Sequence, residues 1–214
     1  MAELNTTGYA LLGLLNQHPW SAYELTQFMR VSHLRAVWPR AESRLYEGPK
    51  KLEQLGYATT SSEQQGKRSR TIYTITDQGR QALRDWLQTD GKDMIFEHEA
   101  LLQLANTDAG DIADLHRIIA RLHASTDAAL EETEAGMRAL AQRSEQLSSD
   151  KRFVISTLVN HFLYETVLAR KRWLAFADDF IEGWTDLEPS EDKLETSRAH
   201  YRELAAQLRQ QTDN

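Results

Sequence analysis

The chain has 214 residues, 41% hydrophobic and 27% charged, which indicates a folded globular protein and excludes a disordered one. It contains no cysteine, which excludes a disulfide scaffold, a cysteine-based zinc site and a thiol nucleophile. The formal net charge of -7 is unevenly spread: residues 1–87 hold 11 basic and 8 acidic side chains, whereas residues 88–214 hold 14 and 24. The N-terminal part therefore suits a polyanionic partner, which the C-terminal part repels.

The sequence shows no pattern of a membrane segment or of export. Its apolar runs fall short of the ~18 residues that a membrane span needs. The N-terminus lacks the basic segment and the small-residue cleavage site of a signal peptide. We therefore expect a cytoplasmic protein that has no membrane partner.

Two capped helices are predicted near the N-terminus. Asn5-Thr6-Thr7 is a helix cap before a mostly apolar helix, which His18-Pro19-Trp20 ends. Ser21 and Glu24 have the S-x-x-E pattern of a capping box, in which each side chain bonds the backbone amide of the other residue. The residues predicted to form the buried face of the second helix are Tyr23, Leu25, Phe28 and Met29.

A third helix is predicted from Trp38-Pro39 to Gly56. Pro39 suits a first-turn position, because its missing N–H would have no helical partner there. Gly56 suits a left-handed cap after the last turn. Gly48-Pro49 lies in the middle of this helix, where a proline removes one backbone hydrogen bond and tends to kink the axis.

A β-hairpin with a basic tip follows the third helix. Residues 58–62 and 71–76 are rich in β-branched side chains, which predicts two strands. Residues 63–70 are expected to form the connecting loop, with a glycine at the turn. Three positive charges gather in this loop, on Lys67, Arg68 and Arg70.

A further helix restarts at Asp77, so the N-terminal order is three helices, a hairpin and a helix. This is the element order of a winged helix-turn-helix domain, which we assign to residues 1–90 with a two-stranded wing.

The remainder, from about residue 93, is predicted to be helical throughout. Asp111 caps a helix of more than 30 residues, and Ser148-Ser149-Asp150 breaks the chain after it. Residues 153–181 are apolar over most of the helix circumference, which predicts the central, most buried helix. Leu194, Tyr201 and Leu208 follow at intervals of seven, a spacing that favours a helix–helix seam. The predicted fold class is mainly α, with a long-helix domain in residues 91–214.

The sequence contains no catalytic or metal-binding pattern. We find no nucleophile elbow, phosphate loop, HExxH motif or pair of carboxylates in a catalytic frame. His116 and His123 are seven residues apart on one predicted helix, but no carboxylate or cysteine pattern completes a metal site. We expect no enzymatic activity, no cofactor and no metal.

Several stretches resemble the PadR family of bacterial transcriptional regulators. They are Ala22-Tyr23-Glu24-Leu25, Arg44-Leu45-Tyr46, Lys51-Leu52-Glu53-Gln54-Leu55-Gly56 and Tyr73-Thr74-Ile75-Thr76-Asp77-Gln78-Gly79-Arg80. The helical part is similar to the variable C-terminal domain of the family, so the resemblance extends over essentially the whole chain. The chain departs from the family at Ala22, which is usually glycine, and at Gly48-Pro49, where a leucine usually follows the tyrosine by three residues.

The resemblance implies a homodimeric repressor that binds a pseudo-palindromic operator in double-stranded DNA, in the cytoplasm and nucleoid of a bacterium. The third predicted helix would enter the major groove, and the wing would reach the flanking backbone or minor groove. Arginine can bond guanine bidentately, and a basic tip can lie against phosphates. The residues predicted to contact DNA are Arg40, Ser43, Arg44, Tyr46, Lys50, Lys67, Arg68 and Arg70.

Other interpretations stay open. A basic hairpin tip is often only solvated, and Arg44 can equally pair with Glu47 along the helix. A low-specificity architectural DNA-binding protein and a helical protein-interaction module both fit the same elements.

The resemblance also implies that some members bind a small aromatic effector at the dimer interface. The aromatic residues suited to line such a pocket here are Phe162, Trp173, Phe176 and Trp184. Aromatic residues at helical spacing are more often plain core, which is the interpretation that we favour for these four.

Overall fold

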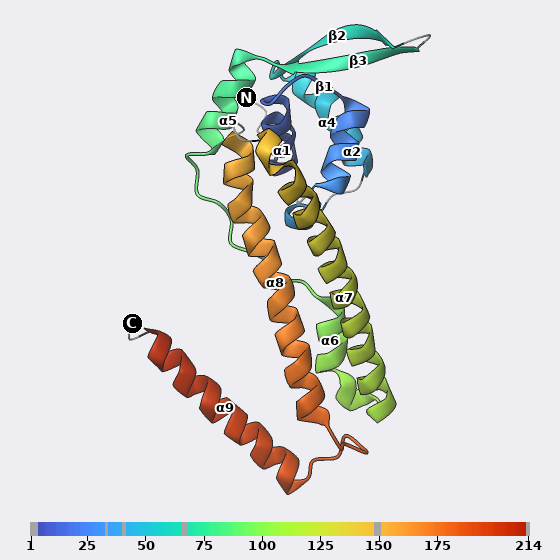
Figure 1. Cartoon of the computed structure of the whole chain (residues 1–214), viewed down its shortest axis with the longest axis vertical. Coiled ribbons are helices and arrows are strands. Elements are labelled where there is room, and N and C mark those ends of the chain that lie inside the picture. Colours follow the sequence, from blue (N-terminus) through green and yellow to red (C-terminus); the bar gives the residue numbers. More distant parts are fainter. Residues whose placement is uncertain (1–3, 33, 40–41, 66–67, 148–150, 213–214) are drawn as a thin grey trace. The chain divides into compact units, whose positions relative to one another are not determined.

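The computed structural model describes residues 4–32, 34–39, 42–65, 68–147 and 151–212 (Figure 1). It divides into two compact units. The N-terminal unit comprises Met1–Ile95 with Val154–Asn160, and the C-terminal unit comprises Phe96–Phe153 with His161–Asn214. Because one helix supplies residues to both units, the predicted domain boundary between residues 90 and 91 stays a prediction.

The described helices of the N-terminal unit are α1 (Thr6–Leu15), α2 (Ala22–Val31), α3 (Leu34–Val37), α4 (Glu42–Gln54) and α5 (Asp77–Trp86). The Asn5 side chain accepts the Gly8 amide at the start of α1, and the capping box of Ser21 and Glu24 opens α2. Both predicted caps are thus confirmed. The short helix α3 was not predicted, and α4 begins at Glu42, so Pro39 does not lie in the first turn of the helix as described.

The core of the N-terminal unit is built around α1. Leu11, Leu12, Leu14 and Leu15 are almost fully buried and pack with residues of α2, α4 and the sheet. Our prediction for Tyr23 was wrong, because its side chain is 65% exposed while Leu25, Thr26 and Met29 form the buried face of α2. The sequence pattern placed Tyr23 on the apolar face, but the buried face of α2 begins at Leu25 and does not include Tyr23.

The central Gly48-Pro49 pair packs α4 against α1. A Cβ at Gly48 would lie 2.2 Å from Cδ1 of Leu11, so only glycine permits this approach. Pro49 is fully buried, and α4 continues through it to Gln54. Gly56 has a φ of 76°, which confirms the predicted left-handed cap.

The sheet has three antiparallel strands in the order β1-β3-β2, formed by β1 (Trp20–Ser21), β2 (Ala58–Gln65) and β3 (Arg68–Ile75). The hairpin is longer than predicted, because Gln65 pairs with Arg68 and most of the expected loop is strand. The third strand was not predicted. It forms because Ser21, as the cap of α2, has an extended backbone, and because the Trp20 indole donates to the Leu14 carbonyl at 3.0 Å.

The described helices of the C-terminal unit are α6 (Glu99–Ala105), α7 (Ile112–Arg143), α8 (Lys151–Ile181) and α9 (Glu191–Thr212), with 3₁₀ turns at Thr107–Ala109 and Ser144–Leu147. Asp111 caps α7, and its 32 residues confirm the predicted long helix. The predicted break at residues 148–150 lies outside the described residues. The prediction of helix from residue 93 was wrong, because residues 90–98 are irregular and Met94, Ile95 and Phe96 are exposed.

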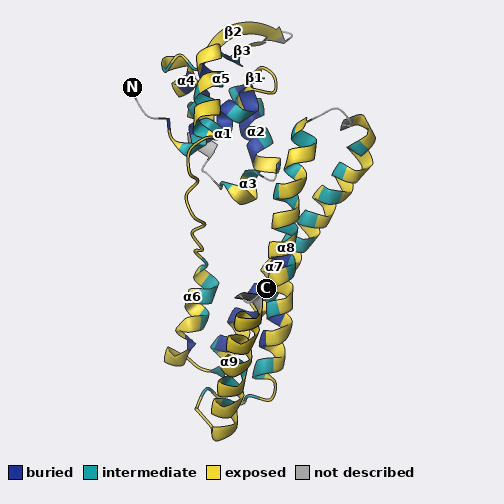
Figure 2. Ribbon diagram, turned by 90° about the vertical axis from the view of Figure 1, so that its left-hand side faces the viewer, coloured by how far each residue is buried: buried dark blue, intermediate teal, exposed yellow. Residues whose placement is uncertain are grey.

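The core of the C-terminal unit lies between α7 and α8, and its buried residues are Leu115, Ile118, Ile119, Leu122, Leu174 and Ala177. Helix α8 is not the most buried helix, because only three of its described residues are buried, and much of its length is exposed in Figure 2. Its exposed apolar residues are Val154, Ile155, Leu158, Phe162 and Phe176. Among the described residues, no helix is both long and apolar enough to cross a membrane.

Candidate nucleic-acid interface

Helix α4 presents a polar face to solvent on the helix-turn-helix. Leu45, Pro49 and Leu52 are buried at steps of three and four, which turns the opposite face outward. Tyr46 is 59% exposed and Lys50 is exposed on that face. Positions 43, 46 and 50 share one side of the helix by spacing.

Three further residues were predicted to contact DNA, namely Arg40, Ser43 and Arg44. Arg40 lies outside the described residues, and so do the side chains of Ser43 and Arg44, whose backbone belongs to α4. Their roles therefore stay predictions.

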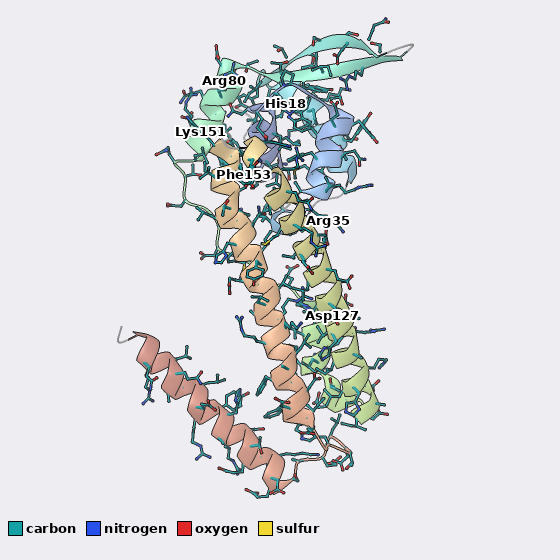
Figure 3. The ribbon with its side chains drawn as sticks, in the orientation of Figure 1. His18, Arg35, Arg80, Asp127, Lys151 and Phe153 are labelled. Atoms are coloured by element: carbon teal, nitrogen blue, oxygen red, sulfur yellow. The ribbon has the colours of Figure 1, made fainter. Side chains whose placement is uncertain are left out.

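The wing is the hairpin of β2 and β3, with side chains along both strands (Figure 3). Lys67 and the side chain of Arg68 lie outside the described residues. The described pairing of the two strands ends at Gln65 and Arg68. Arg70 is three residues further along the chain than Lys67, in β3, and is paired across the hairpin with Glu63.

Arg70 takes part in an ion-pair network. One terminal nitrogen donates to Glu24 Oε1 at 2.6 Å, Nε donates to Glu63 Oε2 at 2.8 Å, and the other terminal nitrogen lies 2.7 Å from the same oxygen. The second oxygen of Glu24 accepts the backbone amide and the hydroxyl of Ser21, at 2.9 and 2.8 Å. One carboxylate thus serves the helix cap and the wing together.

This environment shifts the titration of the network. The Ser21 backbone N–H is the largest cause that lowers the pKa of Glu24, burial opposes it, and the Ser21 hydroxyl and Arg70 lower the pKa further. Hydrogen bonds from Arg70 to Glu63 and then to Glu24 raise the pKa of Arg70. Glu24 and Arg70 are therefore both charged at neutral pH.

The network was not predicted from the sequence. Glu24 was predicted only as a capping residue, and Arg70 only as one charge of a basic hairpin tip. The sequence did contain a signal for the pair of Glu63 and Arg70. Glu63 stands three positions before residue 66, and Arg70 stands three positions after residue 67. Strands that are joined by two residues pair such positions directly, as the register has them.

The four aromatic residues predicted for an effector site lie along α8 and just after it, and their role in binding an effector stays a prediction. Trp173 and Trp184 pack against the C-terminal core, which agrees with the core interpretation. Phe176 stacks on His200 of α9 with ring centroids 4.5 Å apart, whereas Phe162 is 57% exposed.

A surface depression of about 410 Å³ adjoins the end of α8. It is lined by His116, Asp178, Asp179, Ile181, Glu182, Gly183 and Trp184, and so contains one of the four predicted effector residues. Within the described ranges, no group of three or more histidine, aspartate or glutamate side chains is arranged so that it could hold a metal ion. His123 instead bonds Asp178 at 2.8 Å and links α7 to α8.

The helices and hairpin of the N-terminal unit make it a winged helix-turn-helix domain. Residues 11–85 match the model of the Transcriptional regulator PadR-like family, so this part of the chain is similar to the domain that defines that family. The family is one of transcriptional regulators, the class of protein that the sequence predicted for this chain.

Known relatives extend the comparison. The chain is 39% identical over 80 residues to the "Negative transcriptional regulator PadR" of Bacillus subtilis (strain 168), which covers 37% of this chain and 43% of the relative. The chain thus spans less than half the length of that relative at this level of similarity.

Two solved structures of Bacillus subtilis PadR share the fold. PadR in complex with operator DNA matches with a TM-score of 0.69 and 23% identity, over 83% of this chain and 98% of that one. PadR in complex with p-coumaric acid matches with a TM-score of 0.58 and 22% identity, over 81% and 99%.

Proposed function

We propose that the protein is a sequence-specific DNA-binding transcription regulator that acts as a repressor in the bacterial cytoplasm and nucleoid. The observation that carries the proposal is a PadR-like winged helix whose α4 exposes Tyr46 and Lys50 and whose wing ends in basic residues. Helix α4 would lie in the major groove, and Arg40, Ser43 and Arg44 would contact the DNA there. The wing would lie on the flanking backbone or minor groove. Support comes from the relative named as a negative regulator and from the structure of PadR on operator DNA.

The protein is proposed to bind DNA as a homodimer. Val154, Leu158 and Phe162 recur every four residues on the exposed surface of α8, with Ile155 beside them. A face of this kind is covered in a stable protein, and a second copy supplies the same face by two-fold symmetry.

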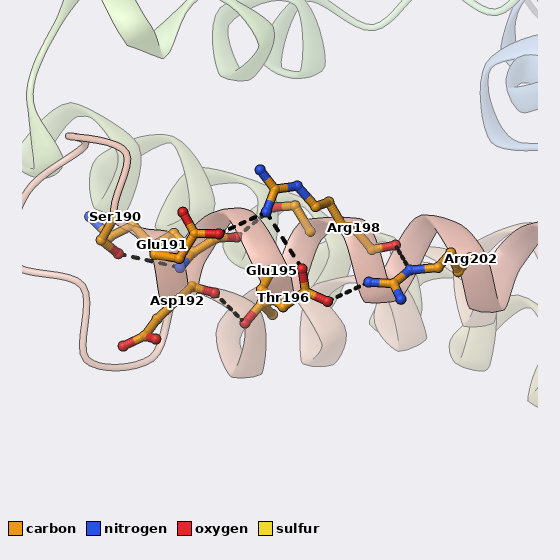
Figure 4. A network of polar contacts seen from close by, with 9 residues as sticks. Ser190, Glu191, Asp192, Glu195, Thr196, Arg198 and Arg202 are labelled. Carbon is orange, nitrogen blue, oxygen red and sulfur yellow. Dashed lines mark hydrogen bonds and ion pairs between the residues drawn. The ribbon is translucent and has the colours of Figure 1, made fainter.

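Helix α9 has a second apolar stripe, made by Leu194, Tyr201, Leu204 and Leu208. Beside it runs a ladder of ion pairs in which Arg198 bonds Glu191 at 2.9 Å and Arg202 bonds Glu195 (Figure 4). These charges bond one another within the helix, and the exposed apolar stripe is proposed to pack against a helix of the second copy.

A small aromatic effector is proposed to release the protein from DNA. The structure of PadR with p-coumaric acid supports this chemistry, and α8 exposes Phe162 and Phe176. Such a ligand changes DNA affinity only if it binds the two conformations of the dimer unequally. Thermal stabilisation of the protein by p-coumaric acid, together with weaker DNA binding, would support the proposal.

The decisive experiment is the selection of bound duplexes from a random DNA pool by the intact protein at near-physiological salt. A two-fold symmetric motif with half-sites about one helical turn apart would support a dimeric regulator. Salt-sensitive binding without an enriched motif would indicate a low-specificity architectural protein. The absence of binding to any duplex would overturn the proposed function.

A further inference from the structure

Arg70 holds the outermost contact between the wing and the helices of the N-terminal unit that we find among the described residues. Strand β1 pairs with β3 only at Ile72 and Tyr73, close to the base of the hairpin. Arg70 lies two residues further out, where strand geometry adds about 6–7 Å. Beyond the β1 pairing, the hairpin is joined to α2 through the side chain of Arg70.

The partners of Arg70 come from two different elements. Glu24 belongs to the first turn of α2, and Glu63 belongs to β2. The guanidinium donates to both carboxylates at 2.6–2.8 Å, a geometry that the planar fork of arginine permits and a lysine ammonium does not reproduce.

The network leaves Arg70 poorly suited to a phosphate. One guanidinium faces two carboxylates, so the three side chains together carry a net negative charge. A phosphate approaching Arg70 would displace one of these partners and meet the charge of the other. Of the three basic residues that the sequence places in this segment, Lys67 and Arg68 therefore remain to supply the favourable charge toward DNA.

We infer that Arg70 is a positioning residue: it clamps the wing to the N-terminus of α2 through Glu24 and Glu63, so that wing and helix-turn-helix meet DNA as one rigid body. This inference rests on the proposed DNA-binding function. Arg70 was predicted to contact DNA directly, whereas we infer an indirect role. A wing that is already held in place loses less conformational entropy when it binds DNA.

Glu24→Gln separates the clamp from the helix cap. Glutamine also serves in capping boxes, so its one side-chain oxygen keeps the Ser21 bond while its NH₂ group faces the guanidinium. Arg70→Lys keeps the positive charge and removes the bridge. Asp85→Asn is the control. The Asp85 carboxylate lies on α5, where it accepts a hydrogen bond from Gln81 at 2.6 Å, so this substitution also removes one negative charge but leaves the clamp intact.

The first measurement is amide hydrogen exchange of the full chain without DNA. We expect Glu24→Gln and Arg70→Lys to speed exchange in the outer hairpin, residues 61–65 and 68–71, by about two- to five-fold, the factor that an exposed ion pair supplies. Asp85→Asn should leave the hairpin unchanged. Unchanged exchange in both wing variants would overturn the clamp whatever the protein binds.

The second measurement is affinity for a random-sequence duplex as salt is varied. The clamp predicts weaker binding for Glu24→Gln, although this change removes a negative charge, and weaker binding for Arg70→Lys. A direct phosphate contact predicts tighter binding for Glu24→Gln, which would free Arg70, and nearly unchanged binding for Arg70→Lys, which would keep the positive charge. Tighter binding by Glu24→Gln would overturn the inference, and the absence of DNA binding by the unmodified protein would overturn the proposed function instead.

Discussion

Gly48 determines how closely α4 approaches α1. Its missing Cβ would lie 2.2 Å from Cδ1 of Leu11, a fully buried side chain surrounded by core. We predict that Gly48→Ala destabilises the chain by about 1–3 kcal/mol through overpacking. Urea unfolding of the two proteins measures the difference.

Gly13→Ala is the matched control, since Gly13 lies in α1 and a Cβ there would meet no atom within 4 Å. This substitution should stabilise the chain by about 0.5–1 kcal/mol, because alanine loses less backbone entropy in a helix. Equal effects at both glycines would contradict the packing role of Gly48.

Glu24 gives the N-terminal unit a pH-dependent contribution to stability. Its folded pKa lies below the ordinary value of 4.5, so the ionised form stabilises the folded state. The contribution is complete above that ordinary value and is lost as the pH falls through the folded pKa. We predict that the unfolding free energies of the unmodified protein and Glu24→Gln differ by a constant amount near neutral pH and converge on acidification. A difference that stays constant down to about pH 3 would refute this.

At this scale the sequence was most informative where an interaction is local. The caps at Asn5, Ser21 and Asp111 and the left-handed Gly56 depend on residues at most four positions away, and all were predicted. The exposure of Tyr23 could not be predicted, because it depends on where the sheet and α4 stop covering α2.

The wing is the element whose structure departs most from the sequence-based prediction. The hairpin itself was predicted from β-branched residues, but its length depends on the pairing register, which a two-residue connection sets. Strand β1 depends on Trp20 reaching the Leu14 carbonyl, an interaction that no periodicity in the sequence encodes. Arg70 is the one of the three predicted basic residues whose contacts are described, and it bonds the carboxylates of Glu63 and Glu24. The pairing register had to be known before the contact with Glu63 could be predicted.

The two remaining charges of the tip should then determine the salt dependence of the wing. We predict that Lys67→Gln and Arg68→Gln each weaken DNA binding on all sequences. Each should also reduce the slope of log K against log salt by about 0.9 for every phosphate that the tip no longer neutralises. Fluorescence anisotropy with a labelled duplex at several salt concentrations measures both quantities. If the variant that carries both substitutions has an unchanged slope, these two residues do not contact DNA.

In the whole molecule, charge and apolar surface are divided between the two parts of the sequence. The basic excess lies in residues 1–87, and the acidic excess lies in residues 88–214, where α8 and α9 expose their apolar stripes. The sequence predicted α8 to be buried because its apolar residues encircle the helix. Within one chain only part of the circumference of α8 is buried. The apolar residues on its exposed part are explained if a second copy of the chain covers them.

Leu158 and Tyr201 test that explanation directly. Their side chains are 75% and 72% exposed, so Leu158→Asp and Tyr201→Asp should leave the folded chain intact. In a two-fold dimer each substitution would bury two carboxylates among apolar side chains and remove two apolar side chains from the interface. We predict that each variant raises the dimer dissociation constant by at least about tenfold, since burying one such side chain contributes about 1.5–3 kcal/mol. Sedimentation velocity at several protein concentrations measures this constant.

Thr196→Asp is the control for the substitution on α9. The Thr196 hydroxyl donates to the Asp192 carbonyl within its own helix, and helical spacing places it on the side away from Leu194 and Tyr201. The substitution adds the same charge to α9 and should leave the association of the chains unchanged. If Leu158→Asp and Tyr201→Asp dissociate into monomers and bind DNA more weakly, while Thr196→Asp remains a dimer, both apolar stripes belong to the dimer interface. Dimers that persist in all three variants would show that another surface joins the copies, and the apolar residues of α8 and α9 would then require a different partner.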